Sequence, residues 1–158
     1  MKTLRLVRHA KSSWKDPSID DFDRPLKPKG IARANKLAAT LGPLPDTQIV
    51  TSPAKRAIDT AKILHRGFAP KNDLLQCDAL YTFDSEVLIQ TIMQCHDCVN
   101  DIFIVAHNPA ITAVANLLGA PNLNNVVTCG YVQLSLNAYS WEQATTAKMK
   151  YVRHLFLD

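Results

Sequence analysis

The chain has 158 residues, enough for one domain and few for two, so we expect residues 1–158 to form a single domain. Its 18 lysine and arginine residues against 14 aspartate and glutamate residues give a net charge of +4, and the basic residues are spread along the sequence. This spread argues against a nucleic-acid-binding protein, while the mild excess suits an anionic substrate. Neither a run of membrane-spanning length nor a signal peptide is present, which predicts a cytoplasmic protein without a membrane partner.

Short apolar segments alternate with amphipathic ones along most of the chain. In chain order we predict a strand at residues 3–7, a loop at 10–29, a helix at 30–41, a strand at 48–51, a helix from 53 to about 64, a strand at 73–77, a helix through 87–93, a strand at 102–106, a helix through 111–118, and two pairing strands at 127–136 and 148–155. Ser52-Pro53 has the pattern of a helix N-cap followed by proline at the first helical position. Such alternation predicts an α/β fold, a three-layer α/β/α sandwich with a mostly parallel central sheet.

Three of the predicted strands end in residues suited to binding a phosphate group. These are Arg8-His9 after the first strand, Ser52 with Arg56 one helical turn further on, and His107-Asn108 after the strand at 102–106. In an open α/β sheet the ligand binds beyond the carboxyl ends of the strands. We therefore expect two imidazoles and two guanidinium groups to meet in one cationic pocket.

Phosphoryl transfer is the chemistry that uses this set of groups. Neutral imidazole is a nucleophile that can carry a phosphoryl group covalently. The planar fork of arginine matches phosphate oxygens, and a second, protonated histidine would complete the set of donors. With so much positive charge from side chains, no metal ion and no cofactor is required. The Cys95-x-x-Cys98 pair lacks a second ligand pair at matched spacing, so we expect reduced thiols there.

Three motifs resemble those of the histidine phosphatase, or phosphoglycerate-mutase-like, superfamily. Leu6-Val7-Arg8-His9 resembles its Arg-His-Gly signature, residues 51–61 resemble its Ser-Pro-x-x-Arg-Ala-x-x-Thr-Ala motif, and Val105-Ala106-His107-Asn108-Pro109 resembles its second-histidine motif. The motifs occur in the order that the family has them. The short chain and the charged run at residues 21–26 are most similar to the SixA-type phosphohistidine phosphatases.

The resemblance implies a role for each matching residue. His9 is expected to be the phosphorylated nucleophile, and Arg8, Arg56 and His107 to bind the transferring phosphate and act with it in catalysis. Residues with a possible supporting role are Asp21, Asp23, Ser52 and Asn108. For Asp21 and Asp23, the sequence leaves open whether they are solvated loop charges or orient a pocket arginine or assist proton transfer.

The sequence departs from the family pattern at two places. Ala10 replaces the usual glycine, which is tolerated where the backbone has negative φ. The stretch 79–84 contains no glutamate where many members of the superfamily place a general acid. A phosphorylated imidazole needs no such acid, because its other nitrogen can already carry a proton. This absence motivates the hypothesis that the substrate is a phosphohistidine, expected to be one in a protein, or another activated phosphoryl compound.

Two alternatives remain open from the sequence. The chain could be a phosphatase for small phosphate esters or nucleotides, with Asp84 or Glu86 as the acid. It could also be a non-catalytic module that binds phosphate or phosphoprotein in the same pocket. The partner is accordingly either a phosphorylated protein or a small phosphorylated compound. The oligomeric state is not predicted.

Overall fold

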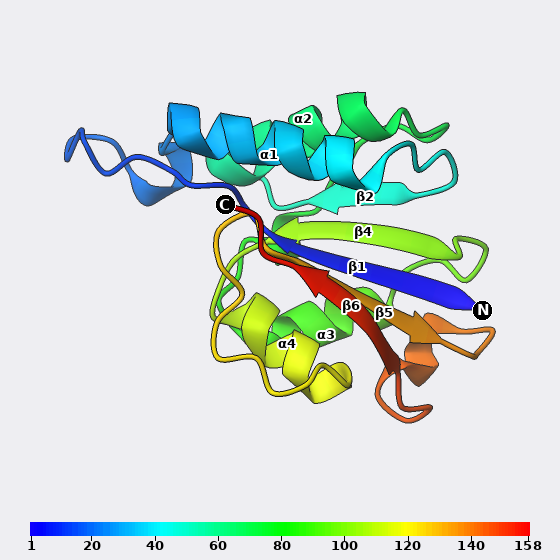
Figure 1. The fold of residues 1–158 in the computed structure, drawn as a ribbon. Coiled ribbons are helices and arrows are strands. Elements are labelled where there is room, and N and C mark those ends of the chain that lie inside the picture. The colour runs from blue at the N-terminus through cyan, green and yellow to red at the C-terminus, as the bar shows by residue number, and fades with distance from the viewer.

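A six-stranded sheet with the order β3-β2-β4-β1-β5-β6 forms the centre of the computed structural model, which describes residues 1–158 (Figure 1). The strands are β1 (Lys2–Arg8), β2 (Gln48–Thr51), β3 (Leu75–Gln76), β4 (Asp101–Ala106), β5 (Tyr131–Leu136) and β6 (Lys150–Leu155). The helices are α1 (Pro28–Leu41), α2 (Lys55–Phe68), α3 (Ser85–Met93) and α4 (Ala110–Leu118), with short 3₁₀ helices η1 (Asp21–Asp23), η2 (Asp78–Leu80) and η3 (Trp141–Ala144). The first four strands pair in parallel, whereas β5 is antiparallel to both of its neighbours, β1 and β6.

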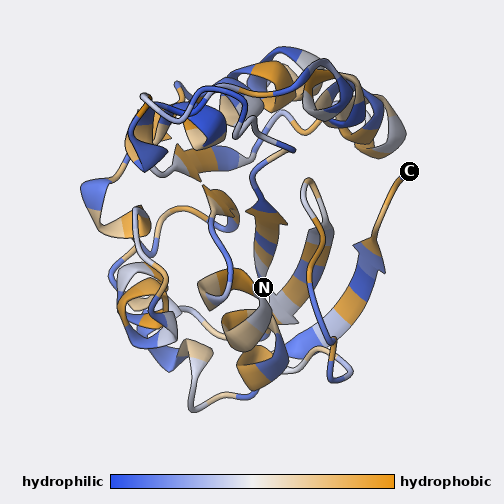
Figure 2. Ribbon diagram, turned by 90° about the vertical axis from the view of Figure 1, so that its left-hand side faces the viewer, coloured by the Kyte–Doolittle hydropathy of each residue, from blue (hydrophilic) through white to orange (hydrophobic).

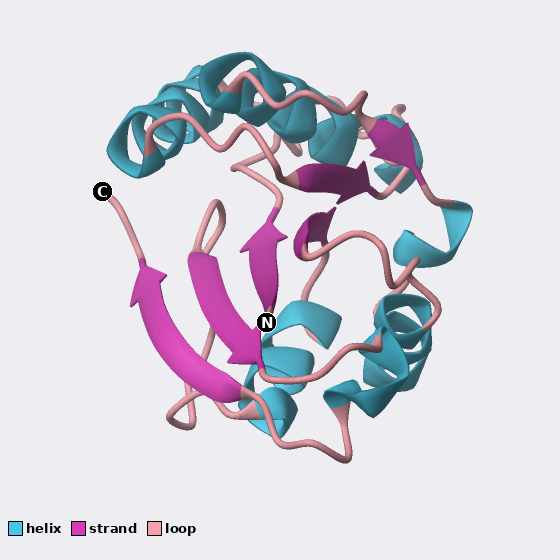
Figure 3. Ribbon diagram, turned by 90° about the vertical axis from the view of Figure 1, so that its right-hand side faces the viewer, coloured by secondary structure: helices cyan, strands magenta, loops and turns pink.

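Helices cover both faces of the sheet, with α1 and α2 on one side and α3 and α4 on the other (Figures 1 and 3). Successive residues of β4 point to opposite faces: Ile102 and Ile104 belong to the core under α3 and α4, while Phe103 and Val105 belong to the core under α1 and α2. This explains the unbroken apolar run of β4, since a strand covered on both faces needs no polar side (Figure 2). The predicted three-layer α/β/α sandwich is confirmed.

None of the helices of the protein combines the length and the apolar character needed to cross a bilayer.

Strand register aligns the three functional strand ends at one edge of the sheet. Arg8 of β1 pairs with Ala106 of β4, and Thr51 of β2 pairs with Val105 of β4. The residues that follow therefore leave the sheet side by side, and the backbone amide of His9 still donates to the carbonyl of Ala106 at 3.1 Å. The expected convergence of the strand ends is thus a consequence of parallel pairing.

Several boundaries differ from the sequence prediction. α2 begins at Lys55, and its N-cap position is Ala54, which has no capping side chain, so Ser52 is not the predicted N-cap. The Ser52 hydroxyl instead accepts from the amide of Ala54 at 3.2 Å and bonds with His107. α2 also continues four residues past the expected end. The strand expected at 73–77 is only two residues long, and β5 starts four residues late because residues 127–130 form a turn closed by a 2.8 Å backbone bond.

Two segments of the loop between β1 and α1, residues 11–13 and 25–27, run side by side. Ser12 forms an isolated antiparallel bridge with Leu26, and the amide of Lys27 donates to the carbonyl of Lys11 at 2.8 Å. Gly30, in the first turn of α1, packs so closely on this segment that a Cβ atom would lie 2.3 Å from the Lys11 carbonyl oxygen. Glycine is therefore required there to seat the loop on the helix.

Candidate active site

A cavity of about 370 Å³ lies at the edge of the sheet where β1, β2 and β4 end. It is lined by Arg8, His9, Lys11, Ser12, Trp14, Asp21, Arg24, Lys27, Arg56, Phe83, His107, Asn108 and Thr128. Five of these side chains are lysine or arginine, and one is a carboxylate. Basic residues that are dispersed in the sequence are therefore concentrated in one cavity, which favours an anionic ligand.

The His9 ring is oriented so that one nitrogen is free to act as a nucleophile. Its Nδ1 lies 2.8 Å from the carbonyl oxygen of Ala10, and since a carbonyl only accepts, Nδ1 carries the proton. The lone pair is then on Nε2, which accepts weakly from Arg56 Nε at 3.3 Å. Burial, together with the nearby guanidinium groups, lowers the pKa of His9 to about 4, so the ring is neutral at neutral pH.

Ala10 fixes this geometry from the backbone. It is not among the residues with positive φ, so the replacement of the family's glycine costs no strain. Its amide donates to Thr60 Oγ1 at 2.9 Å, which ties the segment after β1 to α2. The carbonyl that orients His9 is thereby held by a helix rather than by a free loop.

His107 is almost fully buried beside His9, with 5.2 Å between the ring centroids. Its Nε2 shares a 2.7 Å hydrogen bond with Ser52 Oγ, and its Nδ1 is buried without a hydrogen-bond partner in the chain. Burial, followed by the charges of the neighbouring groups, lowers the pKa of His107 to about 3. The expectation of a protonated second histidine is therefore wrong for the chain by itself, because neither imidazole gains enough from its neighbours to hold a proton.

Arg56 and Asp21 form the central ion pair of the cavity. Arg56 Nη2 donates to Asp21 Oδ2 at 3.1 Å, and Nη1 donates to the Asp21 backbone carbonyl at 2.6 Å. Tyr81 and Arg24 also donate to this carboxylate, at 2.7 Å and 3.1 Å. Burial opposes ionisation of Asp21, but the Tyr81 hydrogen bond and Arg56 outweigh it and lower its pKa. Of the two roles considered for Asp21, its contacts are those of a residue that orients an arginine.

The remaining candidates from the sequence occupy less central positions. Arg8 donates from Nη1 to the carbonyl of Val126 at 3.2 Å, and its buried Nε has no partner in the chain. Asn108 donates to the carbonyl of Val126 at 2.9 Å and accepts from Thr112, so it shapes the loop that closes the cavity. Asp23 is exposed, does not line the cavity and has no side-chain hydrogen bond, as expected of a solvated loop charge.

Several lining residues were missed because they come from loops without periodicity. Arg24 donates to Ser12 Oγ at 3.0 Å, and its guanidinium stacks 3.5 Å above the centre of the Trp14 ring. Trp14 is otherwise exposed at the rim. Tyr81 and Phe83, from the stretch where an acid was sought, place their ring edges against His107 at centroid distances of 5.5 Å and 5.8 Å.

Comparisons with known proteins agree with this architecture. Residues 4–79 match the family model of the histidine phosphatase superfamily (branch 1). An uncharacterized chloroplastic protein of Arabidopsis thaliana is 31% identical over 155 residues, covering 90% of this chain and 70% of that protein. The crystal structure of a candidate phosphohistidine phosphatase SixA from Agrobacterium tumefaciens has a TM-score of 0.80 at 25% identity and covers 99% of this chain and 98% of its own. A mycobacterial glucosyl-3-phosphoglycerate phosphatase shares the fold, with a TM-score of 0.65 at 16% identity over 96% of each chain.

The fold and the cationic cavity thus define a phosphatase. The chain belongs to the histidine phosphatase superfamily, and within it the protein is SixA-like. The resemblance inferred from the three motifs is confirmed. The matched segment includes His9 and Arg56, while His107 lies beyond it and is covered by the structural comparison.

The protonation state of the two buried histidines is directly measurable. Because burial lowers the pKa of His9 to about 4, its ring should stay neutral, with the proton on Nδ1, from neutral pH down to about that value. Side-chain nitrogen–proton correlation spectra recorded across this range would report both the tautomer and the midpoint. A midpoint near the ordinary value of 6.5 would contradict the description of the site. Added phosphate should raise the pKa of His107, since an adjacent anion stabilises its protonated form.

Tyr81→Phe tests whether the phenol acts through Asp21 on Arg56. Loss of a hydrogen bond to a charged group should leave Arg56 less firmly held and weaken vanadate or phosphate binding by roughly threefold to tenfold. Inhibition constants and the melting temperature, measured together, separate a local loss of binding from a general loss of stability. Tyr139→Phe is the matched control, because Tyr139 is 95% exposed and remote from the cavity. Equal anion affinity in both variants would exclude the positioning role.

Proposed function

We propose that the protein is a phosphohistidine phosphatase, in which His9 accepts the phosphoryl group from a phosphohistidine side chain of a protein and passes it to water. One observation carries the substrate assignment. Asp21 is the only acidic residue that lines the cavity, and its lowered pKa and its three donor side chains keep it ionised. No carboxyl group is therefore available there to protonate a leaving group.

In the first step His9 displaces the leaving group. The lone pair of His9 Nε2 forms a bond to phosphorus as the bond between phosphorus and the substrate nitrogen breaks, and the electron pair departs with that nitrogen. When the other substrate nitrogen carries a proton, the imidazole leaves as a neutral molecule and no acid is required. The Nδ1–H bond to the Ala10 carbonyl stabilises the positive charge that develops on the His9 ring.

The phosphoryl oxygens are held by donors that the chain leaves uncommitted. Arg56 uses three of its five N–H groups within the protein, Arg8 Nε has no partner, and the same is true of His107 Nδ1. In the second step a water oxygen bonds to phosphorus as the Nε2–P bond breaks. Inorganic phosphate leaves as dihydrogen phosphate with both protons of the water, and the electron pair of the broken bond returns His9 to its neutral form.

The alternative of a small phosphate ester meets a difficulty in the positions of its candidate acids. Asp84 accepts from the amide of Glu86 at 2.9 Å as the N-cap of α3, and neither residue lines the cavity. The fold shared with a glucosyl-3-phosphoglycerate phosphatase makes small esters the competing substrates to assay. The non-catalytic alternative gives no use to the neutral, unprotonated Nε2 of His9, whose lone pair is engaged only by the 3.3 Å contact with Arg56 Nε.

His9→Ala separates an enzyme from a binding module. The variant should lose turnover by at least about a thousandfold, because the nucleophile is removed, while anion binding persists through the arginines. Phosphate affinity from calorimetry is the control that shows an intact cavity. Quenching the wild-type enzyme during turnover in alkaline denaturant, which preserves the acid-labile P–N bond, should trap one phosphoryl group on His9, detectable by mass spectrometry. Near-normal turnover in the variant would refute the nucleophile assignment.

Substrate preference follows from the missing acid. General acid catalysis is worth about 10² to 10⁴ in rate, so kcat/KM for a phosphohistidine peptide should exceed that for the same peptide with phosphoserine by at least about 10². Both peptides, glycerol phosphate and a nucleoside monophosphate would be compared by phosphate release. Faster hydrolysis of an alkyl ester than of phosphohistidine would favour the small-ester alternative and overturn the proposal.

A further inference from the structure

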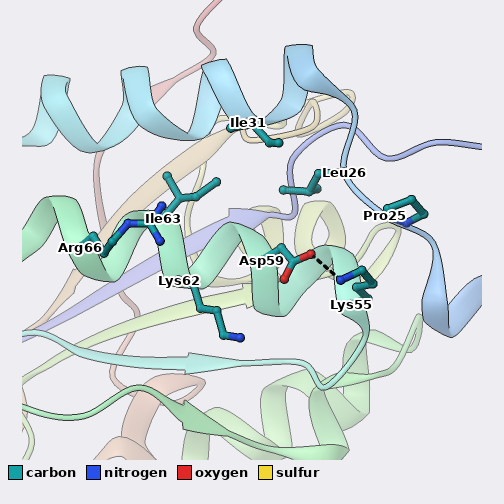
Figure 4. A pocket seen from close by; sticks show the side chains of 8 residues that line it. All are labelled: Pro25, Leu26, Ile31, Lys55, Asp59, Lys62, Ile63 and Arg66. Carbon is teal, nitrogen blue, oxygen red and sulfur yellow. Dashed lines mark ion pairs between the residues drawn. The ribbon is translucent and has the colours of Figure 1, made fainter.

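A second cavity lies outside the active site, between α2, the start of α1 and the segment that precedes it (Figure 4). It has a volume of about 410 Å³ and is named here the α2 groove. Its apolar side consists of Leu26, Ile31 and Ile63, and Ile31 is 44% exposed although it is a large apolar residue. Ile31 and the half-buried Leu26 thus give the mouth of the groove an apolar surface that an apolar side chain of a partner could cover.

The charged side of the α2 groove is strongly basic. Lys55, Lys62 and Arg66 project from α2 at spacings of seven and four residues, which places them along one side of the helix (Figure 4). The only acidic residue lining the groove is Asp59, which is paired with Lys55 at 3.1 Å. Lys62 and Arg66 form no ion pair within the chain, so their charges are available to a ligand.

The α2 groove and the catalytic cavity share two walls. Along residues 24–27, Arg24 and Lys27 line the catalytic cavity, whereas Pro25 and Leu26 line the groove. This segment is fixed by its backbone bonds to residues 11–13. On α2, Arg56 lines the catalytic cavity, whereas the groove is lined by Lys55, Asp59, Lys62, Ile63 and Arg66. A substrate protein whose phosphorylated side chain enters the catalytic cavity can therefore reach the groove by crossing residues 24–27.

We propose that the α2 groove binds an acidic, amphipathic segment of the phosphoprotein substrate, so that the groove is a docking site next to the active site. The inference rests on the proposed phosphohistidine phosphatase function. Carboxylates of the segment would face Lys62 and Arg66, and an apolar side chain would cover Ile31 and Ile63. A basic or neutral partner is disfavoured by the two unpaired cations.

Binding away from the reacting atoms has a specific use in this enzyme. A phosphoryl group alone cannot distinguish one phosphohistidine protein from another, since the same cavity contacts act on all of them. Contacts in the α2 groove add affinity that depends on the surrounding sequence and position the phosphoryl group for attack. The expected signature is a change in kcat/KM for protein substrates with no change for small ones.

The test uses three substrates and three forms of the enzyme. The substrates are phosphoimidazole, a phosphohistidine peptide joined through glycine-serine spacers of increasing length to a Glu/Leu-rich flank, and its twin with glutamine for glutamate. The enzymes are the wild type, Lys62→Glu/Arg66→Glu, and the control Lys148→Glu/Lys150→Glu. The control makes the same charge change at exposed positions near the start of β6, which lies far from α2 in the fold (Figure 1). Melting temperatures confirm that each variant is folded.

We expect the wild type to prefer the acidic peptide over its twin by roughly tenfold in kcat/KM at the best spacer length, and added salt to reduce that preference. Lys62→Glu/Arg66→Glu should abolish the preference and leave phosphoimidazole hydrolysis unchanged, while the control keeps both. No preference in the wild type at any spacer length, or an equal loss in the control, overturns the docking site. Failure of the wild type to hydrolyse phosphoimidazole and both peptides instead overturns the proposed function, and the docking site with it.

Discussion

The contact between Arg56 and Asp21 is the interaction on which the rest of the site depends. The cavity gathers five cationic side chains, and two of them, Arg24 and Arg56, are buried, a costly arrangement without a counter-charge. Asp21 offsets part of this repulsion while Tyr81 and Arg24 hold it in place. The same contact joins η1 to α2 and sets Arg56 Nε beside His9. Because one carboxylate offsets only part of the charge of five cations, the cavity keeps a net positive charge and still attracts an anion.

Burial and register together give His9 the unprotonated ring that the proposed nucleophile requires, without a separate general base. Pairing of β1 with β4 brings His9 next to His107, and desolvation lowers the pKa of both rings. A cationic surrounding acts in the same direction, because a positive charge nearby disfavours the protonated ring. The arginines proposed to bind the phosphate therefore also keep the His9 ring unprotonated.

The sequence predicts the site residues that lie at the ends of strands. Arg8, His9, Ser52 and His107 follow parallel strands, whose ends must share an edge, so their meeting could be inferred. Arg24, Trp14, Tyr81 and Phe83 arrive through loops, where no periodicity indicates which way a side chain points. The prediction of a helix N-cap also fails where a residue distant in the sequence binds the capping side chain. Ser52 forms a hydrogen bond with His107 and does not cap α2.

The absence of an acid in the cavity and the proposed docking groove bear on the same physical problem, which is the selection of a substrate. An activated phosphoryl compound transfers readily, so an enzyme specialised for it gains little selectivity from the chemical step. Phe83 lines the cavity next to His107, where its ring can contact a leaving group but cannot protonate it as a carboxylic acid would. Selectivity must then come from binding, and α2 is suited to provide it, since one face of the helix supplies Arg56 to the phosphate while another presents Lys62 and Arg66 to the protein that carries it.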